Sequence, residues 1–393
     1  MTDSMMHTPA PETMTPGHEL PTPPPSRAKG VLFLRDGCLP PSPCYYNAIT
    51  NALDAGFDLD VYAPQLPQLA DEWRGRVQGR IVQYTMRWLL KHALKPSWRK
   101  ASFFMGTPRL GVAFAGVLGA IHRRPHVVLC DEIFSGSYAG DDPKHWVRLS
   151  NWCHRRAKFT ILPDLCRRPI LLDAVPLPTA HQIYESPNSP CTPPAESCAS
   201  QIRQRLSIPD DAFVVMQAGH LHRLQGGHWM LKVLPSLPPD VYLMIHNGLG
   251  NDGLVAEMTD LLEQHYPIRC SWEHLSWIDV EGYHAAADCG LVFYLHDGPQ
   301  FQAMGRSSTK LCMFLRHGVP VIASRQDSFR FLEEYACGVL IDQPDELLSA
   351  IDHIRNNQDT FRQNAFRCYR EHVDPKFYQP RIVDAFRNFG NGA

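Results

Sequence analysis

Short apolar runs, which are typical of buried strands, alternate along the chain with stretches whose apolar residues recur at helical spacing. In the first half the pattern predicts strands at 30–35, 57–64, 126–130 and 158–163, and a helix at 45–56. In the second half it predicts strands at 212–219, 241–248, 289–295 and 320–324, and helices at 227–237, 311–318 and 344–357. Such alternation predicts α/β domains built on doubly wound parallel sheets.

A break in this pattern divides the chain into two predicted domains, which its length of 393 residues also favours. Repeated prolines between 168 and 211 interrupt any regular element, and we place a linker at 186–210. The linker separates an N-terminal domain at 29–185 from a C-terminal domain at 211–375. Residues 1–28 are predicted to be a disordered tail, and 376–393 a C-terminal helix that packs on another surface of the protein.

The composition is that of an ordinary globular protein, with 44% hydrophobic residues, 20% charged residues and a net charge of −2. The 12 cysteines form no Cys-x-x-Cys pair and the 19 histidines show no metal-ligand spacing, so we expect free thiols in a reducing cytoplasm and no metal site. No apolar run reaches the roughly 18 residues of a membrane span, so no spanning helix is expected.

The stretch from Trp73 to Cys130 contains no Asp or Glu, although Lys and Arg accumulate in it. Within it, residues 80–100 interleave Trp and Leu with basic residues, as a helix lying on a membrane surface would. One interpretation is peripheral membrane contact through 80–100, or an acceptor that carries phosphate; the other is a helix with one core face and one solvated face. Nucleic acid is not expected, because no nucleic-acid-binding fold accompanies the charge.

Two polar segments stand where chemistry is expected. The loop 305–310, GRSSTK, runs straight into an apolar helix, whose free backbone N–H groups attract anions, so the loop is predicted to hold phosphate. Asp131 and Glu132 follow the strand at 126–130, at the edge of the sheet where ligands bind. They are candidates for chemistry or for helix capping.

The segment GRSSTKLCMFLRHGVPVIAS, with the later ACGVLIDQPDELL, resembles the C-terminal domain of GT-B glycosyltransferases of the family 4, or group 1, type. The similarity covers 212–354 and follows the order of polar loop, Ser-x-Lys-Leu helix, Gly-x-Pro-Val-Ile strand and acidic helix cap. The N-terminal half is similar only in architecture. The resemblance implies a GT-B fold of two Rossmann-like domains with a cleft between them, and a nucleoside-diphosphate sugar as substrate, with no cofactor.

The resemblance also assigns donor-binding residues. AGHLHRLQGG is similar to the family's Gly-Arg-Leu-x-x-x-Lys-Gly turn for the donor diphosphate, with His220 in place of the arginine and Gln225 in place of the lysine. Arg223 and Lys310 are expected to supply the missing charge. Asp297 is interpreted as a contact to donor sugar hydroxyls or as a simple Asp-Gly turn, and His220 as a phosphate contact or an ordinary loop histidine. The predicted donor site is Gly219, His220, Arg223, Asp297, Ser307, Ser308, Thr309 and Lys310.

A second departure from the family concerns the mechanism. Retaining members carry a Glu-x7-Glu motif, and here Gly305 and Met313 stand at the two positions. The SSTKL segment also resembles that of inverting bacterial exopolysaccharide glycosyltransferases. We therefore favour an inverting reaction, in which Asp131 or Glu132 removes the proton of the acceptor hydroxyl.

Together these features imply transfer of a sugar, most plausibly from a UDP-linked donor, to a glycan or a polyprenyl- or other lipid-linked acceptor in surface polysaccharide or glycolipid biosynthesis. Asp36 and Gly37 in the first loop are expected to approach the acceptor or the diphosphate, unless they only turn the chain. The enzyme is expected in the cytoplasm, peripheral on the inner face of the membrane. The alternatives are a catalytically silent GT-B relative that binds a glycan or a partner, and a nucleotide-sugar epimerase of the same fold.

Overall fold

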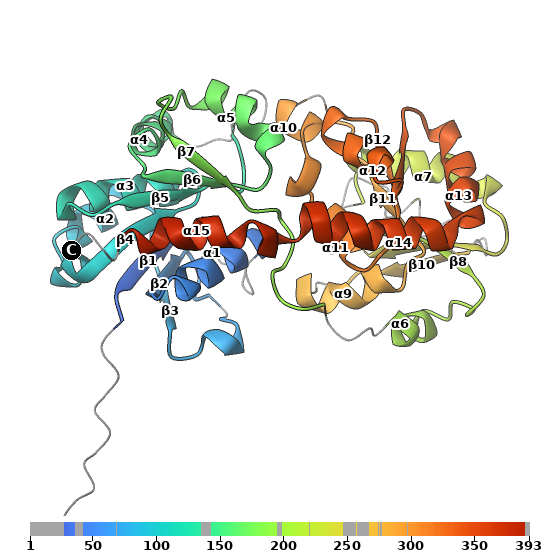
Figure 1. Ribbon diagram of the computed structural model, residues 1–393, viewed down its shortest axis with the longest axis horizontal. Coiled ribbons are helices and arrows are strands. Elements are labelled where there is room, and N and C mark those ends of the chain that lie inside the picture. The colour runs from blue at the N-terminus through green and yellow to red at the C-terminus, as the bar shows by residue number, and fades with distance from the viewer. Residues whose placement is uncertain are drawn as a thin grey trace, which may run out of the picture.

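The computed structural model describes residues 27–35, 42–67, 69–134, 143–194, 199–219, 221–246, 257, 267–273, 275, 277–296 and 298–389. These residues form two parallel β-sheets, one of seven strands and one of six, each covered by helices (Figure 1). This is the α/β architecture that the alternating pattern predicts. The predicted disordered tail lies outside the described residues, apart from its last two positions.

The N-terminal sheet has the strand order β3-β2-β1-β4-β5-β6-β7. Its strands are β1 (Lys29–Phe33), β2 (Asp58–Ala63), β3 (Val77–Ile81), β4 (Ala101–Gly106), β5 (His126–Leu129), β6 (Phe159–Leu162) and β7 (Gln182–Glu185). Its helices are α1 (Pro43–Asp54), α2 (Met86–His92), α3 (Leu110–His122), α4 (Lys144–His154) and α5 (Arg168–Ala174). The strand order reverses between β1 and β4, and such sheets bind ligands outside the carboxyl ends of the strands at the reversal.

The C-terminal sheet has the order β10-β9-β8-β11-β12-β13 and reverses between β8 and β11. Its strands are β8 (Phe213–Ala218), β9 (Val241–His246), β10 (Ile268–Ser271), β11 (Cys289–Val292), β12 (Val321–Ser324) and β13 (Gly338–Ile341). Its helices are α6 (Ala199–Arg205), α7 (Gly227–Val233), α9 (Trp277–Ala285), α10 (Pro299–Gln302), α11 (Thr309–Arg316), α12 (Arg330–Glu334), α13 (Leu347–Asn356) and α14 (Gln358–Cys368). None of the helices in the described part of the chain has the length and apolar character needed to cross a bilayer.

The eight strands predicted from apolar runs are confirmed to within a few residues as β1, β2, β5, β6, β8, β9, β11 and β12, because most of their residues are buried. The pattern did not predict β3, β4, β7, β10 or β13. Every residue of β5, β6, β8 and β11 is buried, which explains why these strands read as continuous apolar runs. We keep 29–185 and 211–375 as proposed domain limits. Within the proposed linker, 199–205 form α6, and its partly buried Ile202 packs against the C-terminal core.

The interpretation of 80–100 as one membrane-surface helix is wrong. Residues 77–81 form the edge strand β3, only 86–92 are α-helical, and 96–100 form the 3-10 turn η2 (Pro96–Lys100). Pro96 cannot continue a helix. Trp98 is buried in the core, with its ring centre 5.3 Å from that of Tyr62 and 6.0 Å from that of Phe104.

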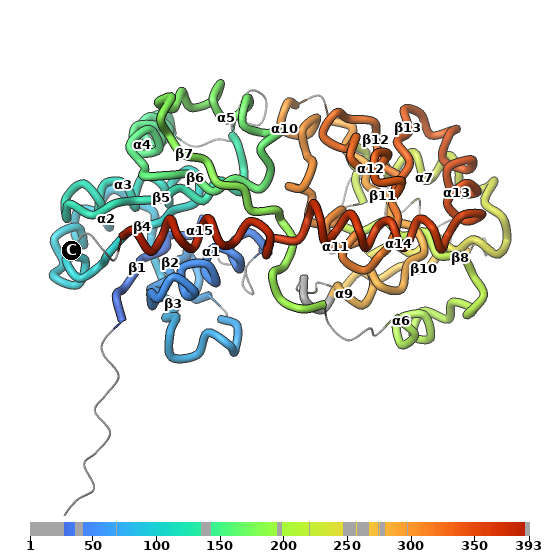
Figure 2. Tube along the Cα trace, viewed as in Figure 1, coloured from blue at the N-terminus to red at the C-terminus, as the bar shows by residue number. Residues whose placement is uncertain are grey.

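The last helix, α15 (Gln379–Arg387), returns from the C-terminal half to the N-terminal sheet (Figure 2). The ring of Phe386 lies 5.1 Å from that of Phe103 in β4 and 5.4 Å from that of Phe159 in β6. Gln379 also hydrogen-bonds Asp54 at the end of α1. The chain therefore crosses between the two halves twice, after β7 and again between α14 and α15.

Arg306 joins the two halves through a buried cluster of charges. Its guanidinium lies 3.1 Å from Asp164 and 2.5 Å from Glu185, both in the N-terminal half. It also donates to the hydroxyl of Tyr378, in the segment that returns toward α15. Burial alone would raise the pKa of the Asp164 carboxyl, but Arg306 outweighs burial and the pKa is lowered. Charges are tolerated at this depth because each has a partner.

Asn188 forms a second connection, on the first crossing. Its backbone N–H donates to Arg306 O at 2.9 Å, and its side chain donates to Thr309 Oγ1 at 2.7 Å. Asn47 of α1 donates in turn to Ser189 O at 2.7 Å. The crossing after β7 is therefore bound to both halves, and it holds the segment that leads into α11.

Gly305 makes room for the Arg306 cluster. Its φ is +44°, and a Cβ built on it would lie only 2.2 Å from Asp164 Oδ2. A side chain at this position would therefore strain the backbone and collide with the carboxylate of the opposite half. This explains why the first position of the Glu-x7-Glu motif holds no carboxylate here.

Gly305→Ala is expected to lower the free energy of unfolding by about 2 to 5 kcal/mol, through backbone strain together with overpacking against Asp164. Gly56→Ala is the matched control, because Gly56 has φ of +97° but no atom within 4 Å of its would-be Cβ. The control is expected to lose only about 1 to 2 kcal/mol from strain. Urea unfolding measures both, and a Gly305→Ala loss no larger than that of the control would contradict the close approach.

Candidate active site

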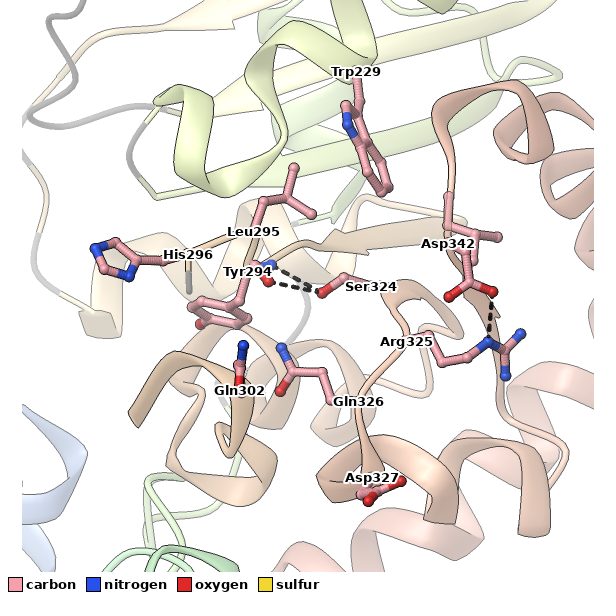
Figure 3. Close-up of a pocket in the computed structure, with 11 residues that line it drawn as sticks. Trp229, Tyr294, Leu295, His296, Gln302, Ser324, Arg325, Gln326, Asp327 and Asp342 are labelled. Carbon is pink, nitrogen blue, oxygen red and sulfur yellow. Dashed lines mark hydrogen bonds and ion pairs between the residues drawn. The ribbon is translucent and has the colours of Figure 1, made fainter. Parts of the chain in front are cut away.

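A cavity of about 440 Å³ lies at the carboxyl ends of β11, β12 and β13 (Figure 3). It is lined by Trp229, Tyr294, Leu295, His296, Gln302, Ser324, Arg325, Gln326, Asp327, Ile341 and Asp342. Figure 3 shows Trp229 reaching this cavity from α7, while Tyr294 follows β11 and Ser324 is the last residue of the neighbouring strand β12. Their positions are fixed by a hydrogen bond from the Tyr294 N–H to Ser324 Oγ at 3.0 Å. Doubly wound domains bind nucleotides at this edge of the sheet.

Lys310, in the first turn of α11, is a buried cation beside this cavity. Its Nζ lies 3.3 Å from Gln225 Oε1, 3.5 Å from Phe293 O and 4.7 Å from the centre of the Tyr294 ring, and this ring lines the cavity. Among the residues that the structure describes, no carboxylate forms an ion pair with it. Burial lowers the pKa of Lys310 to about 7. A desolvated amine with only neutral partners is a place that an anion would complete.

The turn after β8 meets Lys310 through Gln225. Gly219 has φ of +86°, and a Cβ built on it would lie 3.8 Å from Gln225 Oε1, the same atom that accepts a hydrogen bond from Lys310. The structure thus brings the predicted donor residues Gly219 and Lys310 to one place. Gln225 stands where the resembling family has a lysine, and Lys310 brings an amine to that position from a different element.

The hydroxyl groups of the loop before α11 largely have partners within the protein. Ser308 Oγ caps the helix by accepting from the Leu311 N–H at 3.3 Å, and lies 2.8 Å from the Tyr294 hydroxyl. Thr309 Oγ1 accepts from the Asn188 side chain, and so does the backbone O of Ser307. These residues hold the loop against the linker and against the wall of the cavity, which positions Lys310.

The remaining predicted donor residues are placed as follows. Arg223 lies in the 3-10 turn η5 (Arg223–Gln225) and is exposed, with its guanidinium 3.9 Å from Glu257. His220 and Asp297, and also Asp36 and Gly37 of the first loop, lie outside the described residues.

Asp131 and Glu132 follow β5 in the N-terminal half. Tyr45 of α1 donates a hydrogen bond to Asp131 Oδ2 at 2.6 Å. Arg167 donates to the backbone O of Asp131 at 3.3 Å and lies 3.6 Å from the Glu132 carboxylate.

Five residues at this edge of the N-terminal sheet were not singled out from the sequence: Tyr45, Arg167, Phe134, Arg35 and Arg109. The guanidinium carbons of Arg35 and Arg109 lie 5.2 Å and 4.8 Å from the centre of the Phe134 ring. One signal was available, because four of the five follow strand ends: those of β1, β4, β5 and β6. Arg35, Arg109 and Arg167 thus stand at the carboxyl edge of the N-terminal sheet, and Arg167 contacts both Asp131 and Glu132.

No protein-family model and no curated protein matches the chain, but solved structures share its fold. Alr3699/HepE from Anabaena, in complex with UDP-glucose, has a TM-score of 0.71 at 16% identity, covering 91% of this chain and 99% of that one. WaaG, a glycosyltransferase involved in lipopolysaccharide biosynthesis, has a TM-score of 0.62 at 13% identity, with coverages of 91% and 99%. A putative UDP-N-acetylglucosamine 2-epimerase from Listeria monocytogenes has 0.61 at 13%, with 94% and 98%. The chain therefore has the GT-B glycosyltransferase fold, with two Rossmann-like domains.

Proposed function

We propose that this protein is a glycosyltransferase that moves a sugar from a UDP-linked donor to a glycan or lipid-linked acceptor in surface polysaccharide or glycolipid biosynthesis. The observation that carries the proposal is Lys310, a buried amine without a carboxylate partner among the described residues, beside the turn after β8. HepE, which binds UDP-glucose, and the glycosyltransferase WaaG have the same fold, which supports a nucleotide-sugar donor.

On the donor side, the nucleoside would occupy the cavity between Trp229 and Tyr294, and the diphosphate would lie between Gly219 and Lys310. The positive φ of Gly219 lets the backbone turn close to the phosphates without a side chain in the way. A bound diphosphate would favour the charged form of Lys310 and raise its pKa. The same charge would stabilise the nucleotide diphosphate as it leaves, when its negative charge is largest.

On the acceptor side, we propose Asp131 as the base. Its carboxylate is oriented by the hydroxyl of Tyr45, whereas Glu132 is paired with Arg167. Asp131 would take the proton of the acceptor hydroxyl while the oxygen bonds to the anomeric carbon and the bond from that carbon to the diphosphate breaks, which inverts the configuration. The arginines around this edge suit an acceptor that itself carries phosphate.

Two features support inversion over retention. Met313, at the second position of the Glu-x7-Glu motif, is 1% exposed within the C-terminal core, and Gly305, at the first position, has no room for a side chain. No carboxylate from α11 is therefore available to the donor sugar. We place the enzyme in the cytoplasm, peripheral on the inner face of the membrane, where a lipid-linked acceptor would be reached.

Lys310→Met is expected to weaken UDP binding roughly 10- to 100-fold, because a charge-assisted hydrogen bond to the diphosphate is lost. Titration calorimetry with UDP, GDP and dTDP measures this and identifies the nucleotide. Lys232→Met is the matched control, since Lys232 is an exposed lysine of α7, and it is expected to leave the affinity unchanged.

The loss in Lys310→Met is not expected to come from unfolding. The Lys310 amine loses its proton near pH 7 in the folded protein but only near pH 10.5 in the unfolded chain. Burial of the amine therefore lowers the free energy of unfolding by its full amount below about pH 7, and this loss disappears as the pH rises toward 10.5. Lys310→Met should therefore raise the free energy of unfolding at neutral pH by about a few kcal/mol. If the folded wild-type protein binds none of the three nucleotides, the proposal is wrong, and the alternative of a catalytically silent GT-B relative replaces it.

Asp131→Asn is expected to lower kcat by about 10²- to 10⁴-fold with little change in UDP affinity, because the base is lost but the donor site is intact. Glu132→Gln, its neighbour and matched control, is expected to lose less than about tenfold, because its contact to Arg167 only positions the loop. The assay is UDP release from UDP-sugars, with and without a polyprenyl-diphosphate sugar as acceptor. A larger loss in Glu132→Gln than in Asp131→Asn would reverse the assignment of the base.

A further inference from the structure

The side-chain amide of Asn188 joins the first turns of two helices that belong to opposite halves of the protein. Its oxygen, Oδ1, accepts a hydrogen bond from the backbone N–H of Cys44 in the first turn of α1, at 3.0 Å. Its nitrogen, Nδ2, donates to Thr309 Oγ1 at 2.7 Å and to Ser307 O at 3.2 Å, where α11 begins. An amide suits this place, because one short side chain supplies an acceptor to one half and two donors to the other.

Asn188 also supplies a cap that α1 lacks in its own sequence. The first N–H groups of a helix have no acceptor within the helix. Ser42 precedes α1, but within the described part of the chain its side chain makes no capping hydrogen bond, and the Cys44 N–H is bonded by Asn188. In contrast, α11 is capped by its own Ser308. The position of the first turn of α1 therefore depends on the crossing after β7.

The crossing that carries Asn188 is itself held from both sides. Figure 2 shows it in green, between the two halves. Asn47 of α1 donates to Ser189 O at 2.7 Å and accepts from the Cys191 N–H at 3.1 Å. Arg316, at the end of α11, donates to Pro190 O at 2.7 Å. The segment is thus bonded to α1 and to α11, and this fixes the Asn188 amide between the two helices.

Each of the two turns that Asn188 joins carries a residue of the candidate active site. In α1 the residue after the bonded N–H is Tyr45, whose hydroxyl donates to Asp131 Oδ2 at 2.6 Å. In α11 the residue after the bonded hydroxyl is Lys310, whose amine lies beside the donor cavity. The hydrogen bonds of Asn188 therefore connect the carboxylate on the acceptor side to the amine on the donor side, with one backbone step in each helix.

We infer that Asn188 is a positioning residue, which sets the separation between Asp131 and Lys310 during sugar transfer. The inference rests on the proposed function and adds to it a residue that is assigned no contact with either substrate. In the proposed reaction the acceptor oxygen approaches the anomeric carbon from the side opposite the diphosphate, so the base and the amine must keep a fixed separation. Misplacement of a reacting group by about 1 Å lowers a rate by up to about 100-fold. Asn188 prevents such a displacement by bonding both helices at once.

The test is the UDP-release assay on Asn188→Ala, with kcat calculated per UDP-binding site as counted by calorimetry. We expect kcat to fall roughly 10- to 100-fold, while UDP affinity changes by less than about threefold. The affinity is retained because Gln225 and Phe293, the hydrogen-bond partners of Lys310, lie in the same half as the amine. A residue that only stabilised the fold would reduce the number of UDP-binding sites and leave kcat per site unchanged.

Thr309→Val is the second variant, because it removes one acceptor of Asn188 Nδ2 and keeps the shape of the side chain. It is expected to lower kcat by about threefold to tenfold, since the backbone O of Ser307 still accepts from Asn188. The double variant should be no slower than Asn188→Ala alone, because both substitutions act through one connection. Additive losses of kcat would overturn the inference, because Thr309 would then act independently of Asn188.

Gln379→Ala is the matched control. Gln379 is also a side-chain amide at a crossing between the halves, but it donates to Asp54 in the last turn of α1, away from Tyr45. This variant should keep the kcat of the wild type. Unchanged kcat per site in Asn188→Ala, beside an active wild type, would overturn only the role of Asn188. A wild-type protein that binds no nucleotide and releases no UDP would instead contradict the proposed function itself.

Discussion

The buried ion cluster of Arg306 with Asp164 and Glu185 is the contact on which the candidate site depends. A guanidinium at this depth must keep both carboxylates, because removing a partner from a buried pair costs about 3 to 5 kcal/mol. Since the carboxylates come from one half and the arginine from the other, this cost favours a single arrangement of the two sheets. The same contact requires glycine at 305, four residues before α11 begins at Thr309.

Lys310, four residues later, is also a buried basic side chain, but its partners differ from those of Arg306. Arg306 has two carboxylate partners, whereas among the described residues the amine of Lys310 contacts an amide oxygen, a carbonyl oxygen and an aromatic ring but no carboxylate. Proteins rarely bury a basic group without a charged partner. Such a group at a place where ligands bind indicates a functional role that lowers the stability of the protein. The rigid support from the Arg306 cluster would hold this amine in position before the nucleotide arrives.

The sequence predicted eight of the strands in the described part of the chain because each is a short, largely buried apolar run, and it missed the partly exposed edge strands β3 and β7 together with β4, β10 and β13. It also indicated Lys310 as a candidate, because a lysine at a helix N-terminus is a local feature. It did not predict Tyr45 or Arg167, whose role beside Asp131 comes from contacts between elements far apart in the chain. Residues 80–100 were misread because periodicity cannot distinguish Trp98, which lies in the core, from Leu90 and Leu94, which lie in solvent. Likewise, the absence of a carboxylate at Gly305 was visible, but its reason, the approach of Asp164, was not.

The most direct test of this account is the number of protons taken up when UDP binds, measured by calorimetry in buffers of different ionisation enthalpy at about pH 8. With a pKa of about 7, Lys310 is mostly neutral in the free protein at that pH, and a diphosphate beside it should restore its charge. The account predicts uptake of nearly one proton by the wild type and none by Lys310→Met. Binding of UDP with no proton uptake, or with the same uptake in both proteins, would contradict the assignment of Lys310 to the donor phosphates.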